Sequence, residues 1–546
     1  MKFLTPVVLS TVLLAATFGS ARADTLHNLM LIGSELEICS SMESQHCVNN
    51  EWIVANDMRT ARLFQLTDVR RREATSQAIW PRERNDMRNR VASALEELAE
   101  YFGRGVVPDY RFIERLRSRA YLDLLMELSE AEYERILDRL ELARVPGLND
   151  VANVSESPAH TQELMQAFKT MLEPLAGDNT PNVVLITAAA RDSFSAVERY
   201  TSAFEQIGVK VTWLPVSAVV TRAQQSNQCE NLESLRRTML GTFDRDRVNA
   251  AFHEQQVAYC KSNAWQDTLA NAQGVFFVDG RADRLRDAFV VEQEPTPLLR
   301  GILQRYFDGS LVMAAEGGAA QGLVANNMVT NGTSRDAMLN GANARPAPPL
   351  DCDLEGNCPR GLNANSLTYD TLGGLKVYNY GVVDTDVSQR GLQIRMMRIA
   401  QATGTPLALG IDRHTALLVN TAQGFFRVVG ENGVFGLENA QGTDRMLAGS
   451  FHYLMRGATG RISSTGLSEV ELVEQSNQRI EEVTNRFLGN SGIKDSLDSL
   501  CRRGNARLLQ ENIELVMQTT DDSTVLPATR RCQVLNATIG VQRTGR

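Results

Sequence analysis

The sequence has no excess of positive charge and no long apolar segment beyond its first residues. Lysine and arginine together number 56 against 65 aspartates and glutamates, which gives a formal net charge of −9. A nucleic-acid-binding protein needs a basic surface, so this balance argues against a nucleic-acid partner. After residue 23 no run of about 18 apolar residues occurs, and we therefore predict no membrane-spanning helix.

Local metal-binding motifs are also missing. The chain has six histidines, none of them within a few residues of another, and no CxxC pair occurs. We therefore expect neither a metal nor another cofactor. The loop DCDLEGNC at residues 351–358 has spaced carboxylates that vaguely resemble a calcium loop, but the rest of that motif is missing. A surface turn closed by a disulfide is the better interpretation.

The first residues of the chain predict export. Lys2 precedes an apolar stretch from Leu4 to Phe18, and Ala21-Arg22-Ala23 is a small-x-small cleavage site. We interpret residues 1–23 as a cleaved signal peptide, so that the mature protein is periplasmic or secreted.

Cysteine usage agrees with an oxidising compartment. The eight cysteines, an even number, fall in close pairs along the chain. Such a compartment favours disulfides, although the sequence alone leaves their connectivity open. Pairing of neighbours predicts four local bridges, Cys39–Cys47, Cys229–Cys260, Cys352–Cys358 and Cys501–Cys532.

The residues before 179 and those after 460 differ in pattern from the centre of the chain. Residues 24–50 contain one short apolar strand, and residues 51–178 are charged, helix-periodic and nearly free of strand signals. This pattern predicts a helical insertion, in which Ser129 and Glu132 form a capping box at the start of one helix. Residues 461–546 are interpreted as a small helical appendage, with its first helix over about 467–487.

The segment 179–460 predicts an α/β fold. Its continuous apolar strands alternate with helices, which is typical of a mostly parallel sheet covered on both faces. We expect one such sheet, including strands at 375–383 and 407–410. Ligand chemistry gathers at the carboxyl ends of strands in these sheets. Those ends carry Asp279-Gly280-Arg281, Glu316-Gly317-Gly318, Asp384-Thr385-Asp386 and Asp412-Arg413-His414.

The stretch from Ser310 to Gly332 has the pattern of a buried strand, a sharp glycine turn and a helix. Residues 311–315 are an apolar run, Gly317 and Gly318 permit a tight turn, and residues 321–328 are compatible with a helix. In α/β hydrolase-like folds a strand–turn–helix of this kind carries the nucleophile. Glycine stands here where a serine is expected.

In their order along the chain, these strand-end segments resemble cyanophycinase and the related aspartyl dipeptidases. The family patterns FxGGDQ, GTSAGA, DxHF and GIDExTA correspond to FVDGRA at 277–282, EGGAAQ at 316–321, DTDV at 384–387 and GIDRHTA at 410–416. The resemblance covers 29–40 and about 181–455, with the insertion splitting it. It implies a three-layer αβα sandwich with a mostly parallel central sheet, as in class-I glutamine amidotransferases, and serine exopeptidase ancestry.

The chain departs from the family at its working positions. By this resemblance the nucleophilic serine falls on Gly318, the histidine base on Asp386, the acid on Arg413 and the glutamine of the GGDQ turn on Ala282. Serine hydrolysis needs an oxygen nucleophile and a base. The substitutions favour a non-catalytic homologue with a binding or interaction role. The alternative is a hydrolase that uses water, with Asp386 or Glu316 as base.

The polar residues of the predicted cleft have two interpretations. Ion pairing among them is preferred, and a retained site for a peptide or amino-acid-like ligand, whose carboxylate Arg413 could clamp, is the alternative. His414 is preferred as a structural histidine. A protein partner on the insertion and an oligomer stay open. The pocket candidates are Asp279, Arg281, Glu316, Gly317, Asp386, Ser388, Asp412 and His414.

Overall fold

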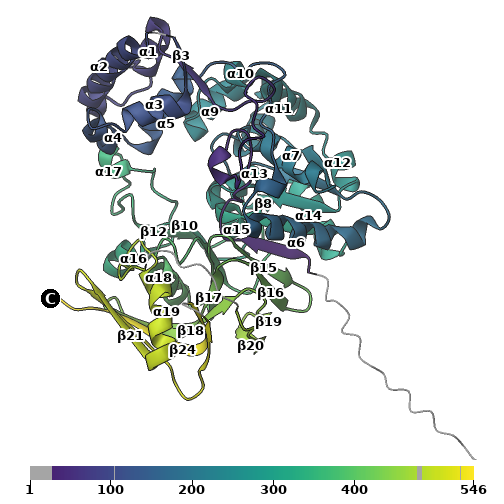
Figure 1. Ribbon diagram of the computed structural model, residues 1–546, viewed down its shortest axis with the longest axis vertical. Helices are drawn as coiled ribbons and strands as arrows, with labels where there is room; N and C mark the ends of the chain where they lie inside the picture. The colour runs from purple at the N-terminus through teal and green to yellow at the C-terminus, as the bar shows by residue number, and fades with distance from the viewer. Residues whose placement is uncertain (1–26, 104, 476–482, 529–530, 546) are drawn as a thin grey trace, which may run out of the picture.

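The structure is a computed structural model, and it describes residues 27–103, 105–475, 483–528 and 531–545. The predicted signal peptide lies outside these residues. In Figure 1 a helical region lies at one end of the molecule, a body of helices and strands in the middle, and a strand-rich region near the C-terminus at the other end. The described part of the chain contains no helix long and apolar enough to cross a membrane.

The larger sheet has nine strands in the order β20-β19-β16-β15-β1-β9-β6-β4-β5. One half is parallel and the other half, which begins where β1 pairs with β15, is antiparallel. The parallel strands are β1 (Leu29–Ile32), β9 (Val312–Glu316), β6 (Gly274–Phe277), β4 (Asn182–Ile186) and β5 (Lys210–Trp213). The antiparallel strands are β15 (Thr415–Asn420), β16 (Phe425–Gly430), β19 (Thr459–Ser463) and β20 (Gly466–Glu471).

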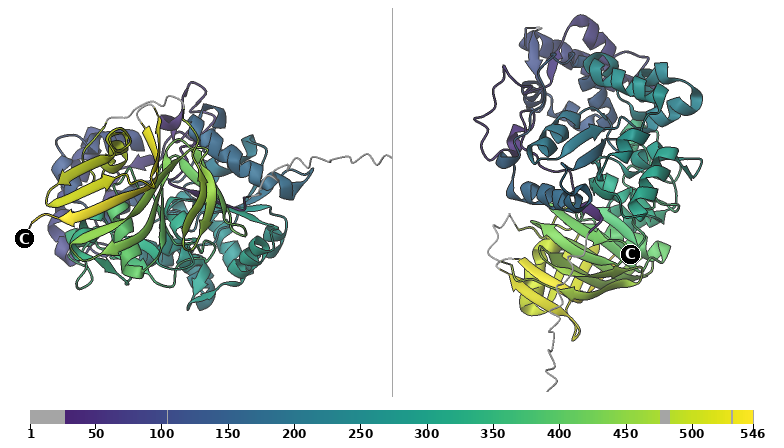
Figure 2. Two further views of the ribbon diagram at one scale, coloured as in Figure 1. Left: turned by 90° about the horizontal axis from the view of Figure 1, so that it is seen from below. Right: turned by 90° about the vertical axis from the view of Figure 1, so that its right-hand side faces the viewer.

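Helices cover both faces of the parallel half, as Figure 2 shows from two further directions. Alternate residues of a strand point to opposite faces, so Leu29 and Leu31 enter one apolar cluster while Met30 and Ile32 enter another. Burial on both faces explains why these strands are continuous apolar runs. The α/β class is confirmed. The covering helices are α8 (Ala218–Ser226), α13 (Ala282–Phe289) and α14 (Pro297–Phe307) on one face, and α6 (Ala159–Ala176) and α7 (Val197–Gln206) on the other.

A second sheet of eight strands follows the order β13-β14-β17-β18-β24-β22-β21, with β23 paired to β24. The prediction of a single sheet is therefore wrong, because β13 (Val382–Thr385) and β14 (Leu407–Ile411) pair with each other here. An apolar strand shows that it is buried but not which sheet it joins. The strand predicted over 375–383 is also too long, since only its last two residues belong to β13. The next strands are β17 (Gly433–Gly442) and β18 (Met446–Met455).

The C-terminal residues 461–546 are mostly strands, so their interpretation as a helical appendage is wrong. Where a helix was predicted over 467–487, β20 pairs with β19; residues 476–482 of that span lie outside the described residues. The apolar spacing of residues 467–471 fits a helix and a strand equally well. Their pairing with β19 at the edge of the sheet makes them a strand. The one helix of this region in the described ranges is α19 (Gly492–Arg503), and the strands that complete the second sheet are β21 (Asn505–Gln510), β22 (Ile513–Gln518), β23 (Thr524–Ala528) and β24 (Arg531–Arg543).

The helical region has an apolar core of its own, formed by residues between Phe64 and Leu140. Ser129 and Glu132 form the predicted capping box at the start of α5. α6 also falls within residues 51–178, but it packs on the larger sheet. The elements around the separate core are β2 (Leu63–Gln65), α1 (Asp68–Ala74), α2 (Asn85–Tyr101), β3 (Val106–Pro108), α3 (Asp109–Leu116), α4 (Leu122–Glu127) and α5 (Glu130–Leu140).

The four predicted disulfides are present. They join neighbouring cysteines within single regions of the fold, and the bridge between Cys352 and Cys358 closes the loop that vaguely resembles a calcium site. The other three are Cys39–Cys47, Cys229–Cys260 and Cys501–Cys532.

Candidate functional site

The glycine turn after β9 is a strained elbow, as predicted, but its helix is short. β9 ends at Glu316, Gly317 has a φ of +47°, and α15 covers only Gly317–Gln321. The chain then turns into β10 (Met328–Asn331), so the helix predicted over 321–328 is wrong. Gly322 lies directly after α15 within this turn, and its propensity to end a helix explains the difference.

Other atoms of the protein occupy the space into which a side chain at Gly317 or Gly318 would project. A Cβ atom added to Gly318 would lie 1.9 Å from the carbonyl oxygen of Gly280. A Cβ atom added to Gly317 would lie 2.1 Å from Oδ1 of Asp279. The obstacle at Gly318 is main chain, which cannot rotate away, whereas the obstacle at Gly317 is a side chain. A serine at position 318 is therefore sterically excluded in this fold, and the strained residue of the turn is Gly317.

The carboxylate of Asp279 binds the amide groups of the elbow. Its Oδ1 accepts hydrogen bonds from the N–H of Gly318 at 2.7 Å and from the N–H of Gly280 at 2.5 Å. Burial raises the pKa of Asp279, although the two amide bonds oppose that rise. The donor at Gly318 is thus already bound to the protein's own carboxylate.

Glu316, the last residue of β9, is a fully buried acid. It accepts hydrogen bonds from the Tyr200 hydroxyl at 2.7 and 2.9 Å and from the Leu36 N–H at 3.0 Å. Burial, followed by the charge of Glu35, raises the pKa of Glu316 well above its usual range. Folding therefore favours the protonated form of Glu316, and its full burial closes it to substrate.

Asp384, at the end of β13, ties the elbow helix to the second sheet. Its carboxylate forms a buried ion pair with Arg395, whose Nε lies 2.8 Å from Oδ2. Gln321 of α15 donates from Nε2 to Oδ1 of the same carboxylate at 2.8 Å. Asp384 therefore has a structural role.

Asp386 and Arg413 form an ion pair. Nη2 of Arg413 lies 2.8 Å from Oδ2 of Asp386, and the arginine side chain is 45% exposed. The charge of Asp386 is close enough to raise the pKa of Asp279 further. The structure thus brings Asp279, Gly317 and Asp386 to one place, with Arg413 at its solvent side.

Ser388 and Asp412 are buried and bound to each other. The Ser388 N–H donates to Oδ1 of Asp412 at 2.9 Å, and the Tyr453 hydroxyl donates to Oδ2 at 2.8 Å. Neither Ser388 nor Asp412 has exposed surface, so Ser388 does not face the cleft. Arg281 pairs with Asp283 at 2.6 Å, and Ala282 is buried at the start of α13.

His414 lies apart from the elbow, in a group that the sequence does not suggest. Its ring stacks on that of His160 with centroids 3.9 Å apart, and Glu37 and Glu431 lie at opposite edges of the stack. Burial lowers the pKa of His414, but bonds to the two glutamates outweigh it and raise the value to about 9. We call these four residues the His–Glu cluster.

Comparisons with known proteins give limited information. No protein-family model matches the chain. A solved structure with which it aligns is the crystal structure of a peptidase from an acI-B1 Actinobacterium, with 14% sequence identity and a TM-score of 0.32. The alignment covers 56% of this chain and 93% of the peptidase chain. A TM-score this low does not assign a function.

Proposed function

We propose that the protein is an exported, non-catalytic homologue of cyanophycinase-like peptidases that acts through binding. The observation that carries this proposal is the closed elbow. The main chain at Gly280 excludes a side chain at Gly318, and the Asp279 carboxylate already binds the Gly318 amide. Serine hydrolysis needs an oxygen nucleophile, which a glycine at this position does not supply. The four disulfides support an oxidising compartment.

The alternative, a hydrolase that activates water, finds less support. Glu316 is fully buried, so a substrate-bound water does not reach it, and its raised pKa favours the protonated form, which is not a base. Asp386 has the better access, but its carboxylate is paired with Arg413. A general base must reach the water it activates and must be ionised before it does so.

The ligand we propose is a peptide or amino acid with a free carboxylate. The guanidinium of Arg413 is the exposed cation of the site and can bind a carboxylate through two parallel N–H donors. When the ligand binds, its carboxylate takes the place of Asp386 as the partner of Arg413. The helical region is a further candidate surface, for a protein partner, because its exposed apolar side chains include Tyr101, Tyr110 and Met126.

The proposal is tested by separate assays of turnover and binding. Purified mature protein is incubated with β-Asp-Arg dipeptide and with cyanophycin, and free amino acids are measured against an active serine exopeptidase as positive control. We expect no release above background. Calorimetry with β-Asp-Arg should show binding that Arg413→Gln weakens about tenfold or more, since one charge-assisted bond pair is lost. The control Arg456→Gln alters another exposed arginine, which pairs with Glu163. Turnover that survives dialysis would contradict the proposal, and so would the absence of binding.

A further inference from the structure

The His–Glu cluster assembles four side chains from four separate segments. Glu37 lies in the loop after β1, His160 in the first turn of α6, His414 between β14 and β15, and Glu431 between β16 and β17. Residues 412–414 and 431–432 are two of the segments in which the chain passes between the larger sheet and the second sheet. The cluster therefore lies where the two sheets meet, and none of its four residues belongs to the elbow.

The two glutamates face different ring nitrogens. Glu37 lies at the Nε2 edge of the stack, 2.8 Å from Nε2 of His414 and 3.6 Å from Nε2 of His160. Glu431 lies at the Nδ1 edge, 3.1 Å from Nδ1 of His160 and 3.6 Å from Nδ1 of His414. A carboxylate that accepts Nδ1–H fixes the histidine tautomer whose Nε2 carries a lone pair.

We propose that the cluster binds one divalent transition-metal ion, with Nε2 of His160, Nε2 of His414 and the carboxylate of Glu37 as ligands and Glu431 as the carboxylate that orients both rings. Two imidazoles and one carboxylate form the protein ligand set of many zinc sites, which leave further positions for water. The pKa of His414 is raised to about 9, so a metal ion would have to displace a proton from this ring. With both rings neutral, the two carboxylates leave a charge of about −2, which a divalent cation neutralises. Glu37 is 31% exposed, so an ion can enter from that side.

One polar atom in the cluster lacks a hydrogen-bond partner. Nε2 of His160 is buried and has none among the described residues. Buried polar atoms are rarely left in this state unless a water or an ion binds them. One donor atom from each of Glu37, His160 and His414 lies within 4.8 Å of the others. Two atoms that bind zinc at about 2 Å are at most about 4 Å apart. The two rings are stacked with 13° between their planes, so a ring must turn before both Nε2 lone pairs meet one ion.

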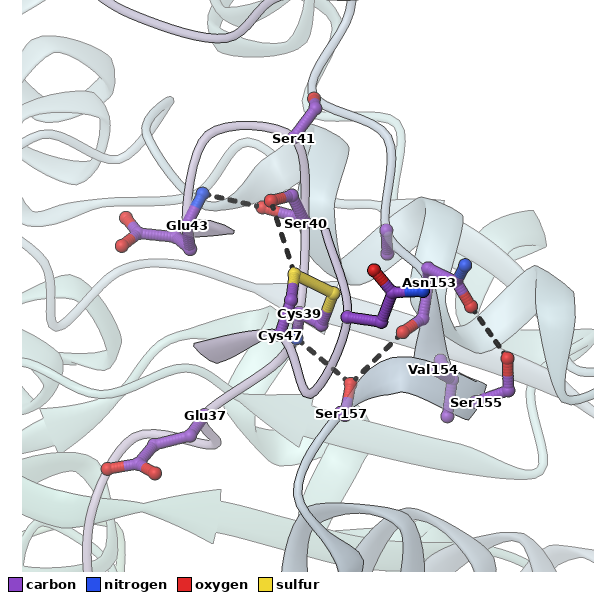
Figure 3. The surroundings of a disulfide bond; sticks show 12 residues. Glu37, Cys39, Ser40, Ser41, Glu43, Cys47, Asn153, Val154, Ser155 and Ser157 are labelled. Atoms are coloured by element: carbon purple, nitrogen blue, oxygen red, sulfur yellow. Dashed lines mark hydrogen bonds between the residues drawn. A yellow bond between two sulfur atoms is a disulfide. The ribbon is translucent and has the colours of Figure 1, made fainter. Parts of the chain in front are cut away.

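The segments that carry Glu37 and His160 are held together by a disulfide loop. Figure 3 shows Glu37 just before the Cys39–Cys47 bridge, with its carboxylate pointing away from the sulfur atoms. Cys39 donates its N–H to Oγ of Ser157 at 2.9 Å and accepts from the N–H of Asn153 at 2.8 Å. Ser157 lies at the start of α6, so the loop fixes the Glu37 segment to the helix of His160. Such a frame reduces the cost of ordering ligands before the metal binds.

Metal content and binding by the purified full-length mature protein test this proposal. After chelator treatment and dialysis, the protein is titrated with Zn²⁺ by calorimetry and with Co²⁺ by visible absorption, which reports coordination geometry. We expect one ion per chain. His160→Gln and Glu37→Gln should each weaken binding at least about a hundredfold, and Glu431→Gln about ten- to a hundredfold, as a residue that orients ligands does.

Two controls separate a metal site from general damage. His253→Gln changes a histidine outside the cluster, which contacts Arg236, and should leave binding unchanged. Thermal unfolding of each variant without metal verifies that it folds. If His160→Gln does not fold, Glu37→Gln tests the ligand set in its place. The proposal is overturned if neither ion binds, or if binding persists unchanged in both ligand variants. Such results would leave the His–Glu cluster as an ion-pair group that joins the two sheets.

Discussion

Glycine at position 318 is required by the main chain around it. The carbonyl oxygen of Gly280 lies where a Cβ atom would project, and neither group can move without distorting a strand end or α15. The absence of a nucleophile is thus built into the backbone of the elbow. A serine introduced at this position would meet the same obstacle.

Gly318→Ala should destabilise the protein by at least about 2 kcal/mol, because forced contacts with main chain cost on the order of 1–3 kcal/mol or more. The measurement is urea unfolding at equilibrium. Gly540→Ala is the matched control, since the nearest atom to its added Cβ would be 3.9 Å away. Equal stability of the two variants would show that the backbone at Gly280 gives way.

Glu316 predicts a dependence of stability on pH. Its pKa in the folded protein is raised above the ordinary 4.5, so folding favours the protonated acid. That stability is fully present below about pH 4.5 and is lost as the pH rises toward the folded value. Glu316→Gln keeps a neutral side chain at every pH. This variant should be about as stable as the wild type at pH 4, and its stability relative to the wild type should rise from pH 5 to 8.

Urea unfolding of both proteins across this range measures the effect. Glu511→Gln, which changes an exposed glutamate, is the control. A stability difference that falls as the pH rises would mean that Glu316 is ionised in the folded protein.

The residues of the candidate site could be predicted in part. Asp279, Glu316, Asp386 and Asp412 were identified at strand ends because polar residues after apolar runs mark that place in a sheet. Their partners were not, since Tyr200 and Glu316 lie 116 positions apart in sequence. The His–Glu cluster could not be predicted either, because His414 and Glu37 are 377 positions apart. Local spacing carries no signal for ligands that the fold brings together.

At the scale of elements, the disulfide loop at 39–47 has a specific expected role. Replacing both Cys39 and Cys47 with serine should lower stability by roughly 2–3 kcal/mol and should also weaken metal binding, because the loop positions Glu37. The pair Cys352 and Cys358 is a matched control, with a sequence separation of 6 against 8. Removing it should cost similar stability and leave metal affinity unchanged.

Unfolding and metal titration of the two double variants compare these effects. If both double variants lost metal affinity to the same extent, the loop at 39–47 would have no particular part in positioning Glu37.

Element types were predicted more reliably than element partners. β1, β4, β6 and β9 follow from uninterrupted apolar runs, and the capping box of α5 follows from serine and glutamate at fixed spacing. The segment at 467–471 was assigned to a helix because its apolar spacing fits either period. Its strand forms through pairing with β19, a contact that the segment alone does not encode.

At the scale of the whole molecule, two sheets replace the single sheet that was expected. Asp386, which follows β13 of the second sheet, still lies close enough to Asp279, which follows β6 of the larger sheet, to raise the pKa of Asp279. Gln321, Asp384 and Arg395 join the elbow helix to the second sheet. A large displacement of the elbow helix would therefore break the hydrogen bond between Gln321 and Asp384, which agrees with a site that is held closed.

The central claim, that the elbow is closed to serine chemistry, is tested most directly by a fluorophosphonate probe. The folded mature protein is incubated with the probe, and its intact mass is measured beside that of an active serine exopeptidase. We predict no adduct on this protein and full labelling of the control. A stoichiometric adduct that disappears when one serine is replaced by alanine would contradict the account.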